Sequence, residues 1–193
     1  MKHNIIKKII IFLLAAGLIA AVVYSAGRLI RFRYPLEYRD IVEKYSEQYD
    51  LDPYLVLAVI NVESRFRHDA VSPKNARGLM QITGKTGEWI AGKLQIADYS
   101  EEKLFDPQTN IMIGCWYLST LYREFGDLDL MLAAYNAGSG NVSQWLKNSK
   151  YSVNGKSLDK IPFRETEQYL VKVKKNLDIY KRLYKNVFAG NFL

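Results

Sequence analysis

Apolar residues along most of this chain recur every three or four positions, a spacing that places them on one face of an α-helix. Almost no segment shows the alternation at period two that a half-buried strand requires. The clearest faces are Tyr38, Ile41, Val42, Tyr45 and Tyr49 early in the chain, and Tyr169, Val173, Leu177, Tyr180, Tyr184 and Val187 near its end. We therefore predict an all-α domain, in which the last face is a packing surface and not a functional site.

Local capping signals predict several helix ends. Asp52 followed by Pro53 predicts the start of a helix that runs to about Glu63, because a short carboxylate caps the first amides and proline fits the first helical position. The same pairing recurs at residues 106–107. The remaining signals are Gly126 as a helix end, Asp127 or Asp129 as the next cap, a turn around Gly138 and Gly140, and loops over residues 65–77 and 148–162.

The pattern differs near the N-terminus, where residues 9–27 hold no charged side chain and are mostly Ile, Leu, Ala and Val. As a helix this run would span about 28 Å, close to the hydrocarbon thickness of a bilayer. The lysines that precede it also fit a cleaved signal peptide. A retained anchor is favoured, since Tyr24 interrupts the small-residue cleavage pattern and three arginines follow at once. Basic residues flank both ends, so charge does not decide the orientation.

The net charge of +7 raises the question of nucleic-acid binding. Residues 1–36 hold six of the 27 Lys and Arg residues and none of the 20 Asp and Glu residues. The rest of the chain is therefore nearly neutral and gives no compositional reason to expect a phosphate-binding surface. The single cysteine, Cys115, leaves no partner for a disulfide within the chain, and its apolar helical surroundings predict a buried structural thiol.

The segment 54–62 is apolar nearly all round, so we expect it in the centre of the domain. Glu63 follows at its end. A carboxyl group held against apolar surface loses hydration of its charged form, which raises its pKa and keeps a proton available near neutral pH. That is what a general acid needs. By position alone, however, a helix-terminal glutamate also fits a surface residue or a partner of Arg65 or Arg67.

Three short motifs follow one another in a defined order: Glu63-Ser64, Gly78-Leu79-Met80-Gln81 and Ala134-Tyr135-Asn136-Ala137-Gly138. Their order and separations resemble the lytic transglycosylases of the soluble-lytic type, glycoside hydrolase family 23. The resemblance covers about residues 45–169. Further matching positions are Asn110, Gly114, Pro162, Glu165, Thr166 and Tyr169. It implies an all-α, lysozyme-like fold, which agrees with the helices predicted from the apolar spacing.

The resemblance also implies site residues. Glu63 matches the family's single catalytic acid and base. The positions that match the lining of sugar subsites are Ser72, Gln81, Tyr117, Tyr135 and Asn136. Tyr117 is a weaker match, which is equally consistent with packing in its helix. Hydroxyl and amide side chains suit this role, because a sugar offers hydroxyl and acetamido groups for hydrogen bonding. Thr83 departs from the methionine that many members have there, which affects the contacts of one subsite.

Ordinary glycosidases use two carboxylates, and the aspartates that could supply a second one match no catalytic position of the family. These are Asp69, Asp98, Asp106 and Asp127. The hypothesis is that Glu63 acts first as acid and then as base, so that the C6 hydroxyl of N-acetylmuramic acid closes on C1 as a 1,6-anhydro end. Two alternatives stay open: a hydrolytic muramidase of the goose-lysozyme kind, and an inactive glycan-binding scaffold of an envelope complex.

These inferences divide the chain into a cytoplasmic basic N-terminus (1–8), a transmembrane signal anchor (9–27), a short linker (28–35) and a lytic transglycosylase domain (36–193). The expected partners are the glycan strands of bacterial peptidoglycan and, through residues 9–27, the cytoplasmic membrane. Because peptidoglycan lies outside that membrane, the domain is expected to face the cell wall. We expect no metal, no cofactor and no nucleic-acid partner, and we expect the lone loop histidine, His68, at the surface.

Overall fold

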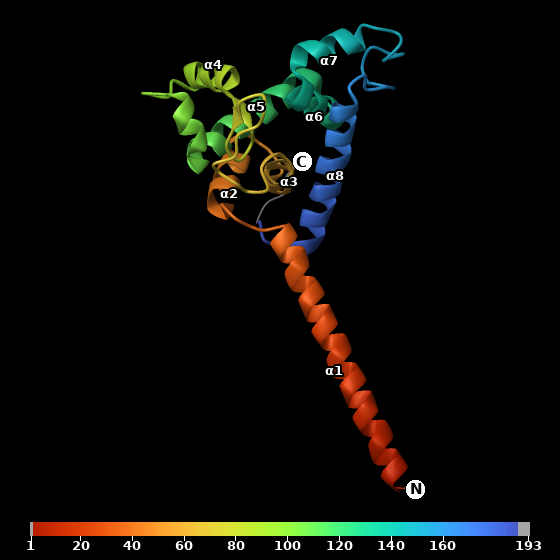
Figure 1. Cartoon of the computed structure of the whole chain (residues 1–193). Helices are drawn as coiled ribbons and strands as arrows, with labels where there is room; N and C mark the ends of the chain where they lie inside the picture. Colours follow the sequence, from red (N-terminus) through yellow and green to blue (C-terminus); the bar gives the residue numbers. More distant parts are fainter. Residues whose placement is uncertain (1, 189–193) are drawn as a thin grey trace. The chain divides into compact units, whose positions relative to one another are not determined.

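The structure is a computed structural model that describes the backbone of residues 2–188 and the side chains of residues 7 and 12–188. Met1 and residues 189–193, which belong to our predicted first and last regions, lie outside the described residues. The chain forms two units, residues 1–36 and 37–193. The elements (Figure 1) are α1 (Lys2–Arg33), α2 (Arg39–Gln48), α3 (Pro53–Glu63), β1 (Ala76–Arg77), β2 (Ile82–Thr83), α4 (Gly84–Leu94), the short 3₁₀ helix η1 (Glu101–Phe105), α5 (Pro107–Phe125), α6 (Leu128–Ala137), α7 (Ser139–Leu146) and α8 (Arg164–Leu183).

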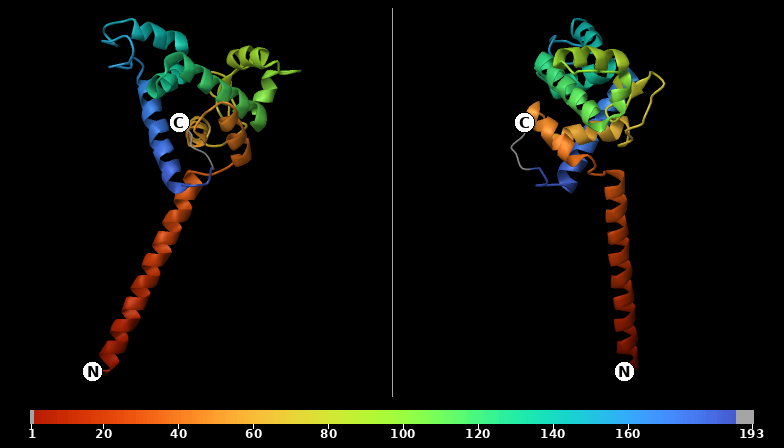
Figure 2. Two further views of the ribbon diagram at one scale, coloured as in Figure 1. Left: turned by 180° about the vertical axis from the view of Figure 1, so that it is seen from behind. Right: turned by 90° about the vertical axis from the view of Figure 1, so that its left-hand side faces the viewer.

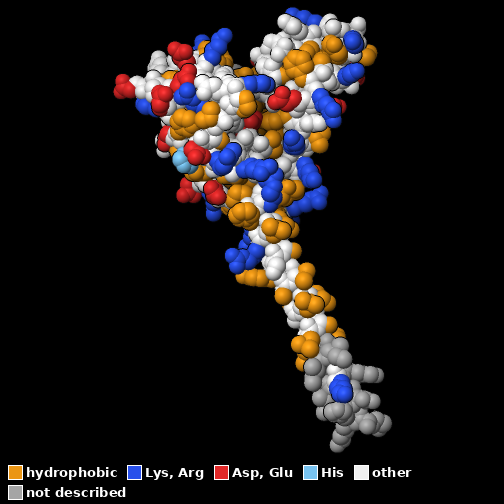
Figure 3. Space-filling view, in the orientation of Figure 1, with side chains coloured by type: hydrophobic (Ala, Val, Ile, Leu, Met, Phe, Trp, Pro, Cys, Tyr) orange, Lys and Arg blue, Asp and Glu red, His pale blue; other side chains and the backbone are white. Residues whose placement is uncertain are grey.

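The first unit is essentially the helix α1. Its part from Phe12 to Arg33 is long and apolar enough to cross a membrane, and protein buries none of it. Figure 3 shows apolar side chains open on the surface of this helix, with basic side chains toward its ends. The helix continues through residues 28–33, which we predict as linker, because no residue there breaks a helix before Pro35. Only residues 34–38 connect α1 to α2.

The centre of the second unit is α3. Its start follows the predicted cap: the Asp52 carboxylate accepts a hydrogen bond of 2.8 Å from the Tyr54 amide, and Pro53 is the first helical residue. The residues from Leu55 to Asn61 are all buried. α3 packs most extensively against α8 and also contacts α2; Figures 1 and 2 show α8 running beside it. An apolar helix of this kind needs protein on all sides, which these neighbours supply.

The helices α5 and α6 begin and end where the capping residues predict. The Asp106 carboxylate accepts a hydrogen bond of 2.8 Å from an amide in the first turn of α5, and Gly126 ends that helix with a left-handed φ of 66°. Of the two candidate caps for α6, Asp127 is the one used, at 2.9 Å from a first-turn amide. Cys115 is buried within α5, as predicted, and burial raises the pKa of its thiol.

Three elements did not emerge from the apolar spacing: the β1–β2 hairpin, α4 and α7. In the hairpin, Ala76 pairs with Thr83 and Arg77 with Ile82 in antiparallel register, and strands of two residues are too short to show an alternation. α4 opens with glycine and polar residues, which read as a turn. Our predicted turn around Gly138 and Gly140 is wrong for its second half, because α7 starts immediately after Gly138.

The last helix, α8, starts after Pro162 as predicted. Its inner face, which includes Tyr169, Val173 and Tyr180, is buried against α3 and α6. A buried polar contact joins two of these helices, since the Asn61 side chain of α3 donates a 2.8 Å hydrogen bond to Asn176 of α8. α8 thereby fixes the end of α3 at which Glu63 lies.

Candidate active site

Glu63 is the last residue of α3. Unlike the buried residues before it, it is half-buried. Its pKa is raised from 4.5 to about 7, chiefly because burial removes solvent from the carboxylate, and the charge of Glu165 adds to the rise. Near pH 7 a substantial fraction of the molecules therefore carries a proton on Glu63, as general acid catalysis requires. The predicted rise in pKa is confirmed. The catalytic role stays a prediction.

Two tyrosines from different helices lie beside this carboxyl group, Tyr135 of α6 and Tyr169 of α8. Burial, and then the charge of Glu63, raise the pKa values of both well above their usual range, so both remain protonated. The Tyr169 hydroxyl in turn lowers the pKa of Glu63 and so opposes part of its rise. This hydroxyl is buried and has no other hydrogen-bond partner among the described residues, so its proton is available to the carboxyl group.

The placement of Tyr169 corrects one of our predictions. The apolar spacing assigns this tyrosine to a packing face, and its ring is indeed only 5% exposed. Its hydroxyl, however, acts on Glu63. The sequence did indicate a role for Tyr169 in the site, because Tyr169 is one of the residues that match the family. At this position the family match is a better guide than the helical spacing.

The Gly-Leu-Met-Gln segment, residues 78–81, forms a tight turn between the two short strands. Gly78 has a φ of 75°, and a Cβ there would overlap the Leu104 carbonyl oxygen and the Asn110 side chain, so glycine is required. Asn110 is fully buried and holds the turn from α5. Its Oδ1 accepts a bond of 2.7 Å from the Met80 amide, and its Nδ2 donates to two backbone carbonyls at 2.7 and 3.0 Å.

Two of the predicted sugar-binding residues meet at this turn. The Tyr135 hydroxyl donates a 2.8 Å hydrogen bond to the Met80 carbonyl, which connects α6 to the turn. Gln81 donates from its amide nitrogen to the carbonyls of Ala70 and Gly78, at 3.1 and 2.9 Å. Because both bonds use the nitrogen, the amide oxygen is the part of Gln81 that can accept a hydrogen bond from a ligand.

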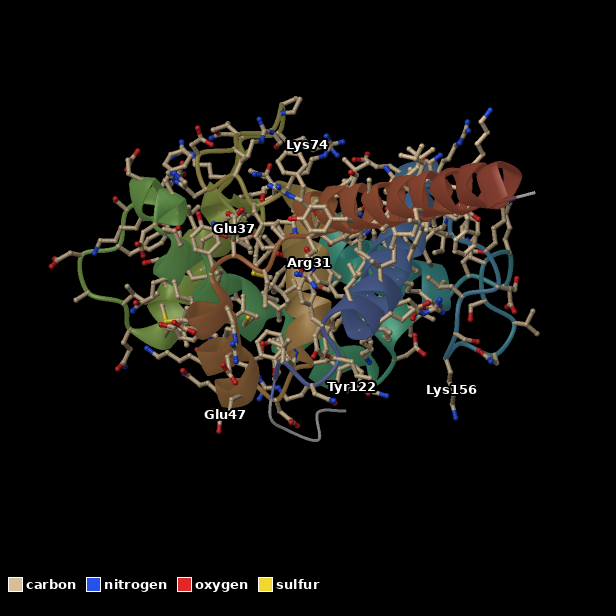
Figure 4. All side chains as sticks on the ribbon, turned by 90° about the horizontal axis from the view of Figure 1, so that it is seen from below. Arg31, Glu37, Glu47, Lys74, Tyr122 and Lys156 are labelled. Atoms are coloured by element: carbon tan, nitrogen blue, oxygen red, sulfur yellow. The ribbon has the colours of Figure 1, made fainter. Side chains whose placement is uncertain are left out.

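Ser72 lies in the loop that precedes β1. Its Oγ accepts hydrogen bonds from the amides of Lys74 and Ala76, at 3.3 and 3.1 Å, which leaves the hydroxyl proton free to donate. The loop reaches α8 through an exposed ion pair of 3.5 Å between Lys74 and Glu165. Figure 4 shows Lys74 at the edge of the domain opposite Tyr122. The structure thus places Ser72 on the side of the domain from which Glu165 acts on Glu63.

Asn136 and Tyr117 extend the site on two sides of Tyr135. The Asn136 Oδ1 accepts a 2.8 Å hydrogen bond from the Thr166 hydroxyl of α8, so its NH₂ group is free for a ligand. The Tyr117 ring lies 5.4 Å from the Tyr135 ring, centroid to centroid, and it is half-buried. Tyr117 therefore contacts a predicted site residue on another helix and does not pack within its own helix alone.

The four aspartates that we considered as a second carboxylate lie elsewhere. Asp106 and Asp127 cap helices, while Asp69 and Asp98 are exposed in loops, as is His68. The carboxyl group that acts on Glu63 is Glu165, whose side chain is 74% exposed. α3, α6 and α8 thus meet around one raised-pKa carboxyl group, and the 78–81 turn is hydrogen-bonded to α6.

The site is thus a raised-pKa carboxyl group at the end of a buried helix, flanked by two tyrosines, within a helical domain. Residues 40–157 match the transglycosylase SLT domain. The chain belongs to this family. The soluble lytic murein transglycosylase of Escherichia coli K12 is 36% identical over 172 residues, which cover 86% of this chain and 26% of that protein. Membrane-bound lytic murein transglycosylase C of Edwardsiella ictaluri is 31% identical over 169 residues, 76% of this chain and 47% of that protein.

A solved structure agrees with this assignment. The crystal structure of the 70 kDa soluble lytic transglycosylase of E. coli matches with a TM-score of 0.72 and 34% identity over 81% of this chain and 26% of that one. The all-α, lysozyme-like fold predicted from the sequence is thereby confirmed. The chain spans about a quarter of the length of these soluble relatives, so the match concerns that part of them alone.

Proposed function

We propose that this chain is a membrane-anchored lytic transglycosylase that cleaves the β-1,4 bond between N-acetylmuramic acid and N-acetylglucosamine in peptidoglycan. The observation that carries the proposal is Glu63, a carboxyl group whose pKa is raised to about 7 at the end of a buried helix. The printed names of its relatives, murein transglycosylases, support the substrate class. No cofactor enters the proposed reaction.

In the first step Glu63, in its protonated form, gives its proton to the glycosidic oxygen. The bond from C1 of N-acetylmuramic acid to that oxygen breaks, N-acetylglucosamine leaves with a new hydroxyl group, and positive charge develops at C1. The raised pKa serves this step, because a carboxyl group with an ordinary pKa of 4.5 would have lost its proton at neutral pH.

In the second step Glu63, now ionised, accepts the proton of the muramyl C6 hydroxyl while the C6 oxygen bonds to C1. The product is a 1,6-anhydro end. Glu63 regains the proton that it gave, and no water is consumed. Tyr169 supports the ionised intermediate state, since its hydroxyl favours the charged form of Glu63. One carboxyl group can therefore serve both steps.

The remaining side chains are assigned to sugar binding. Each keeps a free hydrogen-bonding group: the hydroxyl of Ser72, the amide oxygen of Gln81 and the NH₂ group of Asn136. Tyr135 and Tyr117, whose ring centroids lie 5.4 Å apart, offer ring surface. These groups bind hydroxyl and acetamido groups without competing for the proton of Glu63, because none of them titrates near neutral pH.

Mass spectrometry of digested peptidoglycan tests the reaction. Fragments that are lighter than hydrolysis products by one water support the transglycosylase, whereas ordinary reducing ends support the hydrolytic muramidase. That alternative needs a second carboxylate to activate water, and Glu165 is the group whose charge reaches Glu63. Glu165→Gln therefore keeps the anhydro product under our proposal and loses cleavage under the alternative. A chain that binds glycan but releases no fragment would be the inactive scaffold.

The proposed location is the outer face of the bacterial cytoplasmic membrane, with α1 as a single-pass anchor. The apolar span Phe12–Arg33 and the membrane-bound relatives support anchoring. The connection of residues 34–38 extends at most about 18 Å, which would keep the domain near the bilayer. Ala20→Arg places a charge in mid-span and costs about 3 kcal/mol of insertion, so the membrane-bound fraction should fall. An unchanged fraction would contradict the anchor.

A further inference from the structure

Trp89 is the exposed member of the three tryptophans, with 46% of its surface open to solvent. It projects from α4, and its ring makes T-shaped contacts with Trp116 and Tyr117 of α5, at centroid distances of 5.4 and 6.2 Å. Trp145, by contrast, is 6% exposed. An indole that is held firmly on one side and open on the other presents an apolar face to a ligand.

The contacts of Trp89 continue a row of aromatic rings that starts at the proposed acid. Tyr135 lies within electrostatic reach of Glu63, the Tyr117 ring lies 5.4 Å from Tyr135, and Trp89 comes next. Exposure increases along the row, since Tyr135 and Tyr117 are half-buried and Trp89 is exposed. The row therefore leads from the reacting centre to the surface, along α6, α5 and α4.

The helix that carries Trp89 is capped by Thr83, the position where this chain departs from the methionine of many family members. The Thr83 hydroxyl caps α4 by accepting a 3.3 Å hydrogen bond from the Thr86 amide, and it also bonds the Thr86 hydroxyl at 2.9 Å. Methionine has no such acceptor at a helix start. Thr83, which stands in place of that methionine, thus stabilises the start of the helix that carries Trp89.

We propose that Trp89, supported by Trp116 and Tyr117, is an outer sugar subsite that stacks on a pyranose ring of the glycan strand beyond the two sugars at the cleaved bond. The ligand class follows from the chemistry. One face of a pyranose presents mainly C–H groups, which fit the electron-rich face of an indole, while its hydroxyls point outward to solvent. This inference rests on the proposed function, because it extends the same glycan cleft.

A subsite remote from the reacting bond makes a specific kinetic prediction. Its binding energy is available only to strands long enough to reach it, and such remote contacts raise kcat/KM for long substrates. For the full chain in detergent, we expect Trp89→Ala to lower kcat/KM by at least tenfold on glycans of about eight sugars and by clearly less on glycans of about four. Trp89→Phe keeps an aromatic face and should recover most of the loss.

The matched control is Tyr122→Ala. Tyr122 is another exposed aromatic residue, at 40%; it lines a groove with Tyr49 and Trp116 and makes no ring contact with Trp89 or Tyr117 among the described aromatic pairs. This variant should leave the ratio of activities on long and short glycans unchanged. If Trp89 only packs α4 onto α5, Trp89→Ala lowers the melting temperature and reduces activity on both glycans equally, which overturns the proposal.

A binding measurement separates this inference from the proposed reaction. In the Glu63→Gln background, long glycan should change tryptophan fluorescence. Trp89→Phe should remove most of that change, and Trp89→Ala should weaken binding severalfold. If the wild-type chain forms no anhydro product but this titration succeeds, the proposed reaction fails and the Trp89 subsite stands. If anhydro product forms and neither the titration nor the chain-length ratio responds to Trp89, the subsite is wrong and the reaction stands.

Discussion

α1 and α3 are both apolar helices, yet protein covers only one of them. Leu57 in α3 is fully buried, whereas Leu18 in α1 is 67% exposed. Their lengths differ as well, 32 residues against 11. The same driving force, removal of apolar surface from water, is met by protein neighbours at α3 and has no such partner at α1 among the described residues. The apolar sequence of a helix therefore predicts that the helix avoids water. It does not show whether protein or lipid surrounds it.

The difference matters for chemistry at the helix ends. α1 ends in two arginines, Arg31 and Arg33. α3 ends in Glu63, and its buried surroundings shift the pKa of that carboxyl group to about 7. A helix in the protein core can thus change the protonation of the residue at its end, and this is the feature on which the proposed reaction depends.

The largest expected effect is the loss of activity in Glu63→Gln. The amide can neither give nor take the proton, so kcat/KM on purified peptidoglycan should fall by about 10³-fold or more. Glu47→Gln, an exposed change at the end of α2 (Figure 4), is the matched control and should keep full activity. A Glu63→Gln protein that is folded and retains a tenth of the activity would contradict the assigned role.

The next effect compares the two helices directly. Leu57→Ala removes a fully buried side chain and should lower the free energy of unfolding of the domain by about 2–5 kcal/mol, since a cavity remains. Leu18→Ala, in α1, should change it by less than about 0.5 kcal/mol. Chemical unfolding of the full chain in detergent, followed by near-UV circular dichroism, measures both. Equal effects would mean that α1 is part of the same folding unit.

A third effect follows from the shifted pKa of Glu63. Between pH 4.5 and 7 the unfolded chain loses this proton while the native state keeps it, so the wild-type chain loses stability as the pH rises through that window. The loss reaches about 3 kcal/mol above pH 7. Glu63→Gln does not ionise at this position. Its free energy of unfolding should therefore rise by about 3 kcal/mol relative to that of the wild type between pH 4 and pH 8. A difference that is constant with pH would show that the pKa is not raised.

The smallest effect is a shift in the pH dependence of activity. Because the acid form is required, kcat/KM should fall about tenfold per pH unit above pH 7, the region where Glu63 ionises. Tyr169→Phe removes the hydroxyl that lowers the pKa of Glu63, so the fall of kcat/KM should begin at higher pH. If the pH at which kcat/KM falls does not change, Tyr169 serves packing alone, as its helical spacing suggested. Peptidoglycan release at constant ionic strength provides the profile.

Much of the site was predictable because some of its signals are local. The Asp52-Pro53 start and the Gly126 end depend on groups within one helical turn, and the structure confirms both. The three motifs pointed to Glu63 and to Gln81, Tyr135 and Asn136 as site residues. Trp89 gave no signal, since an exposed tryptophan and a packed one look the same in a sequence until the contacting rings of α5 are known.

The sequence by itself determined α2, α3, α5, α6 and α8, the caps at Asp52, Asp106 and Gly126, the apolar N-terminal span and the family to which the chain belongs. Each of these depends on neighbouring residues or on a motif read as a unit. Only the tertiary structure decided that Tyr169 acts on Glu63 and that Glu165 adds to the rise of its pKa. These residues lie about a hundred positions from Glu63 along the chain. Their approach depends on how α3, α6 and α8 pack, because desolvation and charge act through space and not along the backbone.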